Sequence, residues 1–229
     1  MKRAFPILAI LTAILLSRAL YLALVWAPTE QTMGDVQRIF YYHVPSAWTA
    51  FILFLINFVA SILYLVRRNP AADMVALVCA EVGVVFCTIV LVTGPIWARP
   101  VWGIWWTWDM RLTSTLVLWL IYVSYLVLRR FSASGQTPVL AASMAVLGAL
   151  CVPFVYFSIW FFRTQHPQPV MGGGGSIDPR MLHVLLINWL AFSCFAFLVC
   201  WSRYRLEKIQ REVDQAHAMQ SLNDPRSSR

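Results

Sequence analysis

The apolar residues of this chain fall into six long runs separated by shorter polar segments. Each run has roughly 20 residues, and at about 1.5 Å per residue a helix of that length can cross a hydrocarbon core of about 30 Å. The pattern predicts an all-α integral membrane protein, a bundle of six transmembrane helices. The runs cover residues 5–26, 46–66, 73–92, 112–128, 138–160 and 181–202.

The composition agrees with a membrane protein and excludes an ordinary soluble domain. Apolar residues make up 60% of the 229 residues, charged residues only 12%, and the mean hydropathy is +0.67. These values lie far from those of soluble globular proteins. We therefore divide the chain into a six-helix transmembrane domain, residues 1–202, and a basic and polar cytoplasmic tail, residues 203–229.

The basic residues lie mostly on one side of the predicted membrane. Twelve Lys and Arg residues fall in the termini and in the loops on the side of the termini, and five fall on the opposite side. Short loops rich in Lys and Arg stay in the cytoplasm, so both termini are predicted to be cytoplasmic. The net charge of +8 reflects this topology, and no nucleic acid partner is expected. The five residues on the opposite, outer side are Arg38, Arg99, Arg111, Arg163 and Arg180.

The outer segment Trp102-Gly-Ile-Trp-Trp-Thr-Trp-Asp109 concentrates four tryptophans and a carboxylate in eight residues. Trp102, Trp105, Trp106 and Trp108 would offer a large apolar surface with indole N–H donors. Tryptophan also gathers at membrane interfaces as an anchoring belt, so a ligand cradle and a belt both account for the cluster. Asp109 is placed to cap the fourth helix.

Two histidines flank membrane spans on the same outer side. His43 precedes the second predicted span and His166 follows the fifth, so both are expected in loops outside the spans. Two neutral imidazoles from separate loops can serve as the axial pair of a haem iron. His183, at the start of the sixth span, is a rival ligand. The arginines that could pair with haem propionates are Arg38, Arg99, Arg111 and Arg163.

Some features of the sequence leave alternatives open. Arg18 and Glu81 fall within spans, where they either pair with each other or serve separately, Arg18 reaching the interface and Glu81 turned inward. The glycine run at residues 172–175 is either flexible or tightly turned. Pro153 is predicted to bend the fifth span or to leave a carbonyl free.

The tryptophan segment and its continuation, Met-Arg-Leu-Thr-Ser114, resemble the WWD signature of haem-handling proteins in cytochrome c biogenesis. The Asp-x-Arg-Leu-Thr-Ser ending is similar to the CcmC branch of that family. The supporting segments are Arg38-Ile-Phe-Tyr-Tyr-His-Val-Pro-Ser46, Leu91-Val-Thr-Gly94, Arg99-Pro-Val-Trp-Gly103 and Ser176-Ile-Asp-Pro179. Six spans in a chain of this length also suit the CcmC branch.

The resemblance implies a protein of the bacterial inner membrane that binds haem b (iron protoporphyrin IX) at its outer face. It would load haem onto the membrane-anchored periplasmic chaperone CcmE, beside an ATP-binding-cassette complex of CcmA, CcmB and the small CcmD. By match of motif, His43 and His166 take the axial positions, and Trp102 through Asp109 take the cradle. The protein would hold and present haem without being an enzyme itself.

Two other functions fit part of the sequence. A bis-histidine membrane cytochrome or electron carrier would usually carry its ligands on helices inside the bundle, whereas His43 and His166 are predicted outside the spans. A transporter that moves haem across the bilayer would need a polar pathway, and none is visible in the apolar runs. The sequence has no nucleotide-binding loop, so ATP hydrolysis is expected in a partner subunit.

Overall fold

A computed structural model of the chain describes residues 4–132, 136–167 and 177–223. Within these ranges the chain is helical and contains no strand. Six helical segments are long and apolar enough to cross a membrane. The predicted fold class, an all-α membrane protein with six transmembrane helices, is confirmed. The glycine run at residues 172–175 lies outside the described residues.

The fifth crossing is made of two helices that meet at Leu150. Pro153 explains the interruption, because its ring has no N–H for the carbonyl of Ala149 and would clash with it in a continuous helix. The structure therefore shows an interruption close to this proline, which the sequence predicts to bend the span or to leave a carbonyl free. In chain order the elements are α1 (Ala4–Tyr21), a π-helical turn (Leu22–Trp26), a 3₁₀ turn (Asp35–Ile39), α2 (Phe40–Arg67), α3 (Pro70–Trp102), α4 (Met110–Phe131), α5 (Thr137–Ala149), α6 (Cys151–Phe161) and α7 (Pro179–Asn223).

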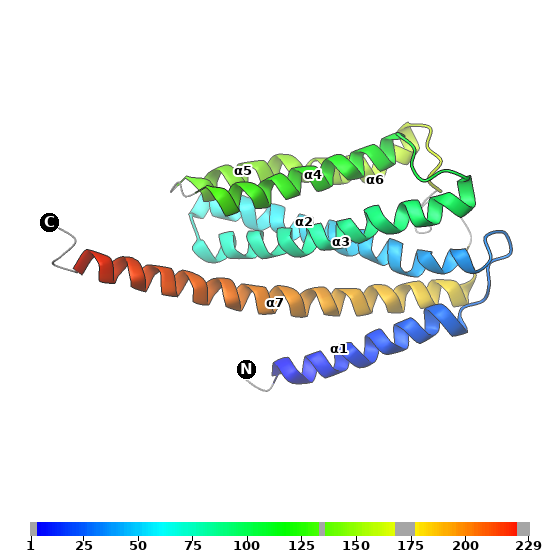
Figure 1. Cartoon of the computed structure of the whole chain (residues 1–229), viewed down its shortest axis with the longest axis horizontal. Helices are drawn as coiled ribbons and strands as arrows, with labels where there is room; N and C mark the ends of the chain where they lie inside the picture. The colour runs from blue at the N-terminus through cyan, green and yellow to red at the C-terminus, as the bar shows by residue number, and fades with distance from the viewer. Residues whose placement is uncertain (1–3, 133–135, 168–176, 224–229) are drawn as a thin grey trace.

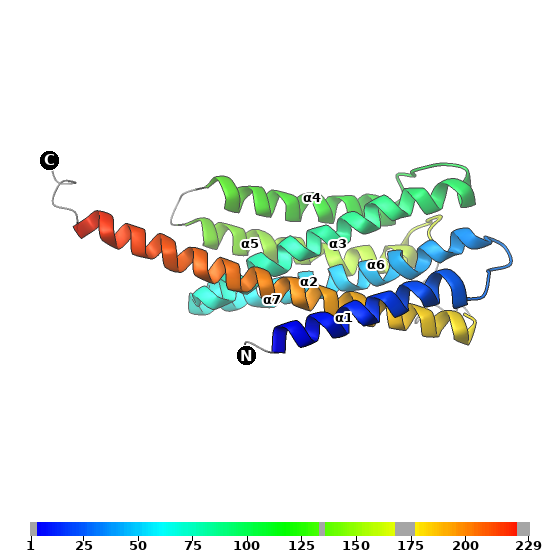
Figure 2. The ribbon, with the colours of Figure 1, turned by 60° about the horizontal axis from the view of Figure 1, so that its bottom comes forward.

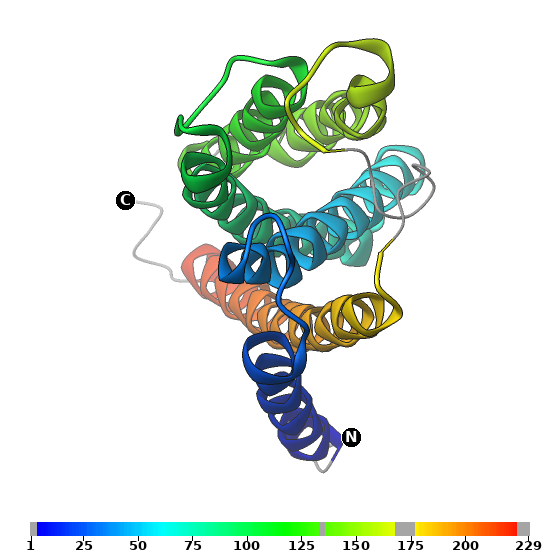
Figure 3. The ribbon, with the colours of Figure 1, turned by 90° about the vertical axis from the view of Figure 1, so that its right-hand side faces the viewer.

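The crossing helices run side by side, and both ends of the chain lie at the same end of the bundle (Figure 1). The opposite end carries residues 27–39, 103–109 and 162–167, and we call it the loop end. Figure 3, a view onto the loop end, shows α4 and α6 on one side, α2 and α3 next, then α7, with α1 outermost. Helix α1 packs chiefly against α7, which it crosses in Figure 2.

Helices α2 and α3 extend beyond the apolar runs that predict them. Helix α2 begins at Phe40 rather than at residue 46, and α3 continues past residue 92 to Trp102. Apolar runs mark the part of a helix that sits in hydrocarbon, whereas aromatic residues let the helix continue into the interface. The prediction that His43 lies in a loop outside the second span is therefore wrong, since His43 is on the first turn of α2.

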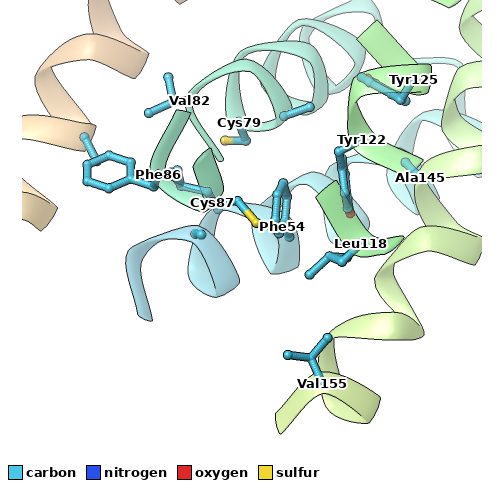
Figure 4. Packing of buried hydrophobic residues seen from close by; sticks show 14 of the residues in the cluster. Phe54, Cys79, Val82, Phe86, Cys87, Leu118, Tyr122, Tyr125, Ala145 and Val155 are labelled. Atoms are coloured by element: carbon cyan, nitrogen blue, oxygen red, sulfur yellow. The ribbon is translucent and has the colours of Figure 1, made fainter. Parts of the chain in front are cut away.

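The core is formed where α2, α3 and α4 meet (Figure 4). Phe54 stacks on Tyr122 with ring centroids 3.9 Å apart, and its ring lies so close to Gly83 that a Cβ there would come within 2.7 Å. Asn57 donates to the carbonyl of Ala76 at 2.7 Å and accepts from the Tyr122 hydroxyl at 3.3 Å. Buried polar groups of this kind fix helices against each other in a membrane.

A buried ion network ties α7 to α3 and α4 at the end of the bundle that carries the termini. The Asp73 carboxylate is 3% exposed and receives Arg129 at 2.5 and 2.8 Å and Arg211 at 2.7 Å. About two helical turns further along α7, Arg203 donates two hydrogen bonds of 2.8 Å to Glu81. Buried charges are tolerated when they are paired in this way.

Helix α7 continues without a break through the boundary that the sequence suggests at residue 202. The first residues of segment 203–229 therefore pack against α3, as the contacts of Arg203 show. The partner of Glu81 is also settled. It pairs with Arg203, while Arg18 is exposed on α1.

We predict that Asp73→Ala strongly destabilises the protein, because it leaves the buried Arg129 guanidinium without its anion. Removing one partner of a buried ion pair costs about 3–5 kcal/mol. The measurement is the melting temperature of the purified protein in detergent. The control is Glu212→Ala, which removes an exposed pair with Lys208 and should leave the melting temperature near that of the wild type. Equal melting of the two variants would contradict the prediction.

Candidate functional site

His43 lies at the loop end of α2, with its side chain buried against α3. Its Nδ1 atom is 2.8 Å from the hydroxyl of Thr93. The ring also meets Trp97 edge to face, with centroids 5.9 Å apart. His43 is therefore held on a packed helix by contacts on two turns of the neighbouring helix.

His166 reaches the same place from the segment that follows α6. Its ring centroid is 6.4 Å from that of His43, and the two ring planes are inclined by 35°. The Nδ1–H of His166 donates to the carbonyl of Pro167 at 2.9 Å, because a carbonyl oxygen can only accept. The structure thus brings together the two histidines that the sequence predicts, and Nε2 of His166 keeps a free lone pair.

The protonation state of His166 suits a ligand. Burial, together with the positive charge of Arg111, lowers the pKa of His166 from its ordinary value to about 4. The hydrogen bond to Pro167 and the nearby charge of Asp109 act in the opposite direction and are outweighed. The imidazole is therefore neutral near pH 7, as coordination of a metal requires.

Asp109 connects the tryptophan loop to the histidine loop. One carboxylate oxygen caps α4 by accepting from the backbone N–H of Leu112 at 2.9 Å, which confirms the predicted cap. The other oxygen accepts from the hydroxyls of Thr107 at 3.2 Å and Thr164 at 2.8 Å, and from the N–H of Gln165 at 3.4 Å. No salt bridge to an arginine is found for Asp109 among the described residues.

The contact continues from Asp109 to His166 itself. The Thr164 hydroxyl, which donates to Asp109, accepts from the backbone N–H of His166 at 3.1 Å. A hydroxyl can do both because it has one donor hydrogen and two acceptor lone pairs. The position of the His166 backbone is therefore coupled to the carboxylate through one threonine.

The four tryptophans of the cluster occupy different environments. Trp102 is the last residue of α3, which ends at Gly103 in the left-handed conformation with φ of +77°. Trp105 and Trp108 are 59% and 75% exposed. Trp106 is half-buried, meets Trp108 edge to face at 5.8 Å, and has a buried indole N–H without a partner. The cluster therefore combines exposed rings with one ring turned into the protein.

Of the arginines expected near the site, Arg111 is the one that lies close to both histidines. It acts electrostatically on His43 and on His166. Its Nη1 donates to the carbonyls of Val155 at 3.2 Å and Tyr156 at 3.1 Å. These bonds fasten the start of α4 to α6 and place a positive charge beside the imidazole pair.

Arg38 and Arg99 are bound to backbone or to their own loops, and Arg163 is exposed on the segment after α6. Arg38 donates to Asp35 at 3.0 Å and to the carbonyl of Ala23 at 2.7 Å. Arg99 donates to the carbonyl of Gly103 at the end of α3. Both contacts stabilise the connections of the loop end.

His183, the rival ligand, is exposed on α7. Its ring contacts Trp26 at the end of the first crossing, with centroids 6.0 Å apart and planes inclined by 67°. The histidine ring that contacts His43 is that of His166. The structure therefore pairs His43 with His166 and places His183 against a different helix.

Sequence reasoning did not assign roles to Thr93, Thr107 and Thr164. Threonine is common in membrane helices and loops, where its hydroxyl often bonds a nearby carbonyl. Thr107 and Thr164 carry no signal beyond their closeness to a tryptophan or a histidine. Thr93 stands in the segment 91–94, which contributes to the family resemblance but whose role the sequence alone does not give.

We predict that Asp109→Asn loosens residues 162–167 without unfolding α4. The amide oxygen can still cap Leu112. The amide nitrogen, which can only donate, would replace the carboxylate oxygen that accepts from Thr164 and Gln165. Loss of an acceptor for buried donors costs about 1–3 kcal/mol, so hydrogen exchange in residues 162–167 should speed up roughly tenfold or more. Asp178→Asn, at the start of α7, is the control. Exchange that is the same in both variants would contradict the coupling.

The family model and the curated relatives that match this chain all point to the same family. The family model described as Heme exporter protein C (CcmC) matches residues 1–219. The chain is 36% identical to Heme exporter protein C of Bradyrhizobium diazoefficiens, covering 96% of this chain and 84% of that protein. It is 35% identical to Heme exporter protein C of Escherichia coli strain K12, covering 91% and 83%. It is 34% identical to a putative cytochrome c biosynthesis ccmC-like mitochondrial protein of Marchantia polymorpha, covering 80% and 78%. The chain therefore belongs to the CcmC family of heme exporter C proteins.

Proposed function

We propose that this protein handles haem for cytochrome c maturation, and that it holds haem b at the loop end through His43 and His166. The observation that carries the proposal is the 6.4 Å separation of the two ring centroids. Metal–nitrogen bonds of about 2 Å, with about 1 Å from each nitrogen to its ring centre, place two axial imidazoles about 6 Å apart. The recorded spacing fits one metal ion between the rings.

The surroundings of the pair also fit haem, which is an apolar plate with two carboxylates. The buried indole N–H of Trp97, whose ring contacts His43, and that of Trp106 in the tryptophan loop have no partner among the described residues. Buried donors are nearly always paired, so the carboxylates of a ligand would supply the missing acceptors. Arg111 adds a positive charge that acts on both histidines, and Arg38 and Arg99 add charge at the same end.

The chain's own residues would hold haem and leave its chemistry to a partner. Haem brings an iron and vinyl groups, and its covalent attachment would occur on a partner's side chain. His43 and His166 would fix the plate, Asp109 would keep the His166 loop in place, and Trp102, Trp105 and Trp108 would line its exposed edge. The exposure of Trp105 and Trp108 supports a site that is open to another protein.

We infer the partners from the family, and the orientation in the membrane from the charge pattern. The receiving partner would be the haem chaperone CcmE, and CcmA, CcmB and CcmD would form the complex in which ATP is hydrolysed. The protein would be an inner-membrane component, not an enzyme. The twelve basic residues on the side of the termini support cytoplasmic termini and a periplasmic loop end.

A bis-histidine electron carrier is the second candidate, and the placement of His43 on a helix favours it. An electron carrier retains its haem with both ligands on rigid helices. His166 instead lies on an irregular segment at the loop end. Release of haem to CcmE distinguishes the two functions, since a carrier would keep its haem when the chaperone is added.

We predict that His43→Ala and His166→Ala each abolish the low-spin absorption spectrum of the haem-loaded protein, because each removes one axial nitrogen. His183→Ala is the matched control, since His183 is also at the loop end but contacts Trp26. It should leave the spectrum unchanged. A low-spin spectrum that survives His166→Ala and is lost in His183→Ala would contradict the assignment of the second ligand.

Substitution of the tryptophan cluster distinguishes a haem cradle from a membrane belt. Replacing Trp105, Trp106 and Trp108 together with Ala should leave membrane insertion and protein level largely intact, but should lower haem retention and transfer to CcmE. The control is the pair Trp26→Ala and Trp160→Ala, which removes exposed rings at the same end. The measurement is haem per purified protein, together with covalent haem on CcmE. Normal haem content and transfer in the triple variant would make the cluster a belt.

A further inference from the structure

The segment Leu91-Val-Thr-Gly94 has no role in the function described so far, yet two of its residues lie directly against His43. The hydroxyl of Thr93 is 2.8 Å from Nδ1 of His43. A Cβ added to Gly94 would come 3.5 Å from Cε1 of the same ring. The imidazole therefore rests on this part of α3, with its Nδ1 side held by a single hydroxyl.

The direction of the hydrogen bond follows from the other partner of Thr93. The hydroxyl lies 2.7 Å from the carbonyl of Ile89, which can only accept. A hydroxyl has one hydrogen, and we place it toward Ile89, because two oxygens 2.7 Å apart need a hydrogen between them. The oxygen then accepts from His43, so Nδ1 of His43 carries the proton. The remaining nitrogen, Nε2, keeps its lone pair.

We propose that Thr93 is a positioning residue of the haem site, which holds His43 in the Nδ1–H tautomer with Nε2 available to the iron. The proposal rests on the proposed function, because it assigns Thr93 its role through ligation by His43. When a histidine binds a metal through one ring nitrogen, a group that is hydrogen-bonded to the other nitrogen fixes both the tautomer and the orientation of the ring.

The other histidine shows why Thr93 matters more than an ordinary neighbour. His166 has its Nδ1 fixed by the backbone carbonyl of Pro167. A backbone acceptor is present whatever the side chain, whereas the acceptor for His43 depends on one threonine. The site therefore has a side-chain determinant of ligation on α3, and substitution can remove it while the histidine remains.

The test uses the full-length protein, purified without haem in detergent and titrated with ferric haem. Thr93→Val keeps the shape of the side chain and removes the acceptor, and Thr93→Ser keeps the acceptor. Loss of the group that hydrogen-bonds to a ligating histidine lowers the affinity for the metal by about 10- to 100-fold. We expect that loss in Thr93→Val, with a smaller low-spin fraction, and recovery of both in Thr93→Ser.

Thr88→Val is the matched control. Thr88 lies on the same helix and donates to a carbonyl one turn back, but its oxygen accepts from Trp119 and not from a histidine. It should bind haem like the wild type. If Thr93→Val does so as well while His43→Ala loses the low-spin spectrum, the proposal for Thr93 is wrong and the haem function stands. If His43→Ala keeps that spectrum, the haem assignment itself fails.

A second measurement needs no variant. Nitrogen NMR of the haem-free full-length protein labelled with ¹⁵N-histidine reports which ring nitrogen of His43 is protonated, with His43→Gln used to assign the signal. We expect the proton on Nδ1. A proton on Nε2 would overturn the proposal, because that tautomer offers its lone pair to Thr93 and none to the iron.

Discussion

The carboxylate of Asp109 holds the two loops of the candidate site in one arrangement. It caps α4 through Leu112 and accepts hydroxyl donors from Thr107 and Thr164. An anion at a helix N-terminus is stabilised by the backbone N–H groups and by the helix dipole, so one carboxylate can serve several donors. The last residue of the tryptophan signature thus sets the position of His166 as well as the start of the helix.

The two histidines are held in different ways, and the difference suits temporary binding. His43 is fixed by a packed helix and by Thr93 and Trp97 of its neighbour. His166 depends on the hydrogen bonds of one irregular segment. Loops open locally at lower free energy than packed helices. In the proposed site, one rigid and one loop-borne ligand would hold haem firmly and still allow its release, which a permanent electron carrier does not require.

Hydropathy and motif spacing predicted the six crossings, a disturbance of the fifth crossing at Pro153, the cap at Asp109 and the meeting of His43 with His166 at one end of the bundle. They misplaced the start of α2, because apolar runs locate hydrocarbon and do not mark where a helix ends. The roles of Thr93 and Thr164 could not be predicted, since each depends on contacts across more than 40 positions of the chain. Arg203, the partner of Glu81, could not be predicted for the same reason, since it lies far away in the sequence on α7.

The most direct test of the account is an experimentally determined structure of the haem-loaded protein. We expect the iron between Nε2 of His43 and Nε2 of His166, with Nδ1 of His43 still bonded to Thr93 and the carboxylate of Asp109 still bonded to Thr164. Haem ligated by His183, or haem bound among the membrane-spanning helices away from the loop end, would contradict it.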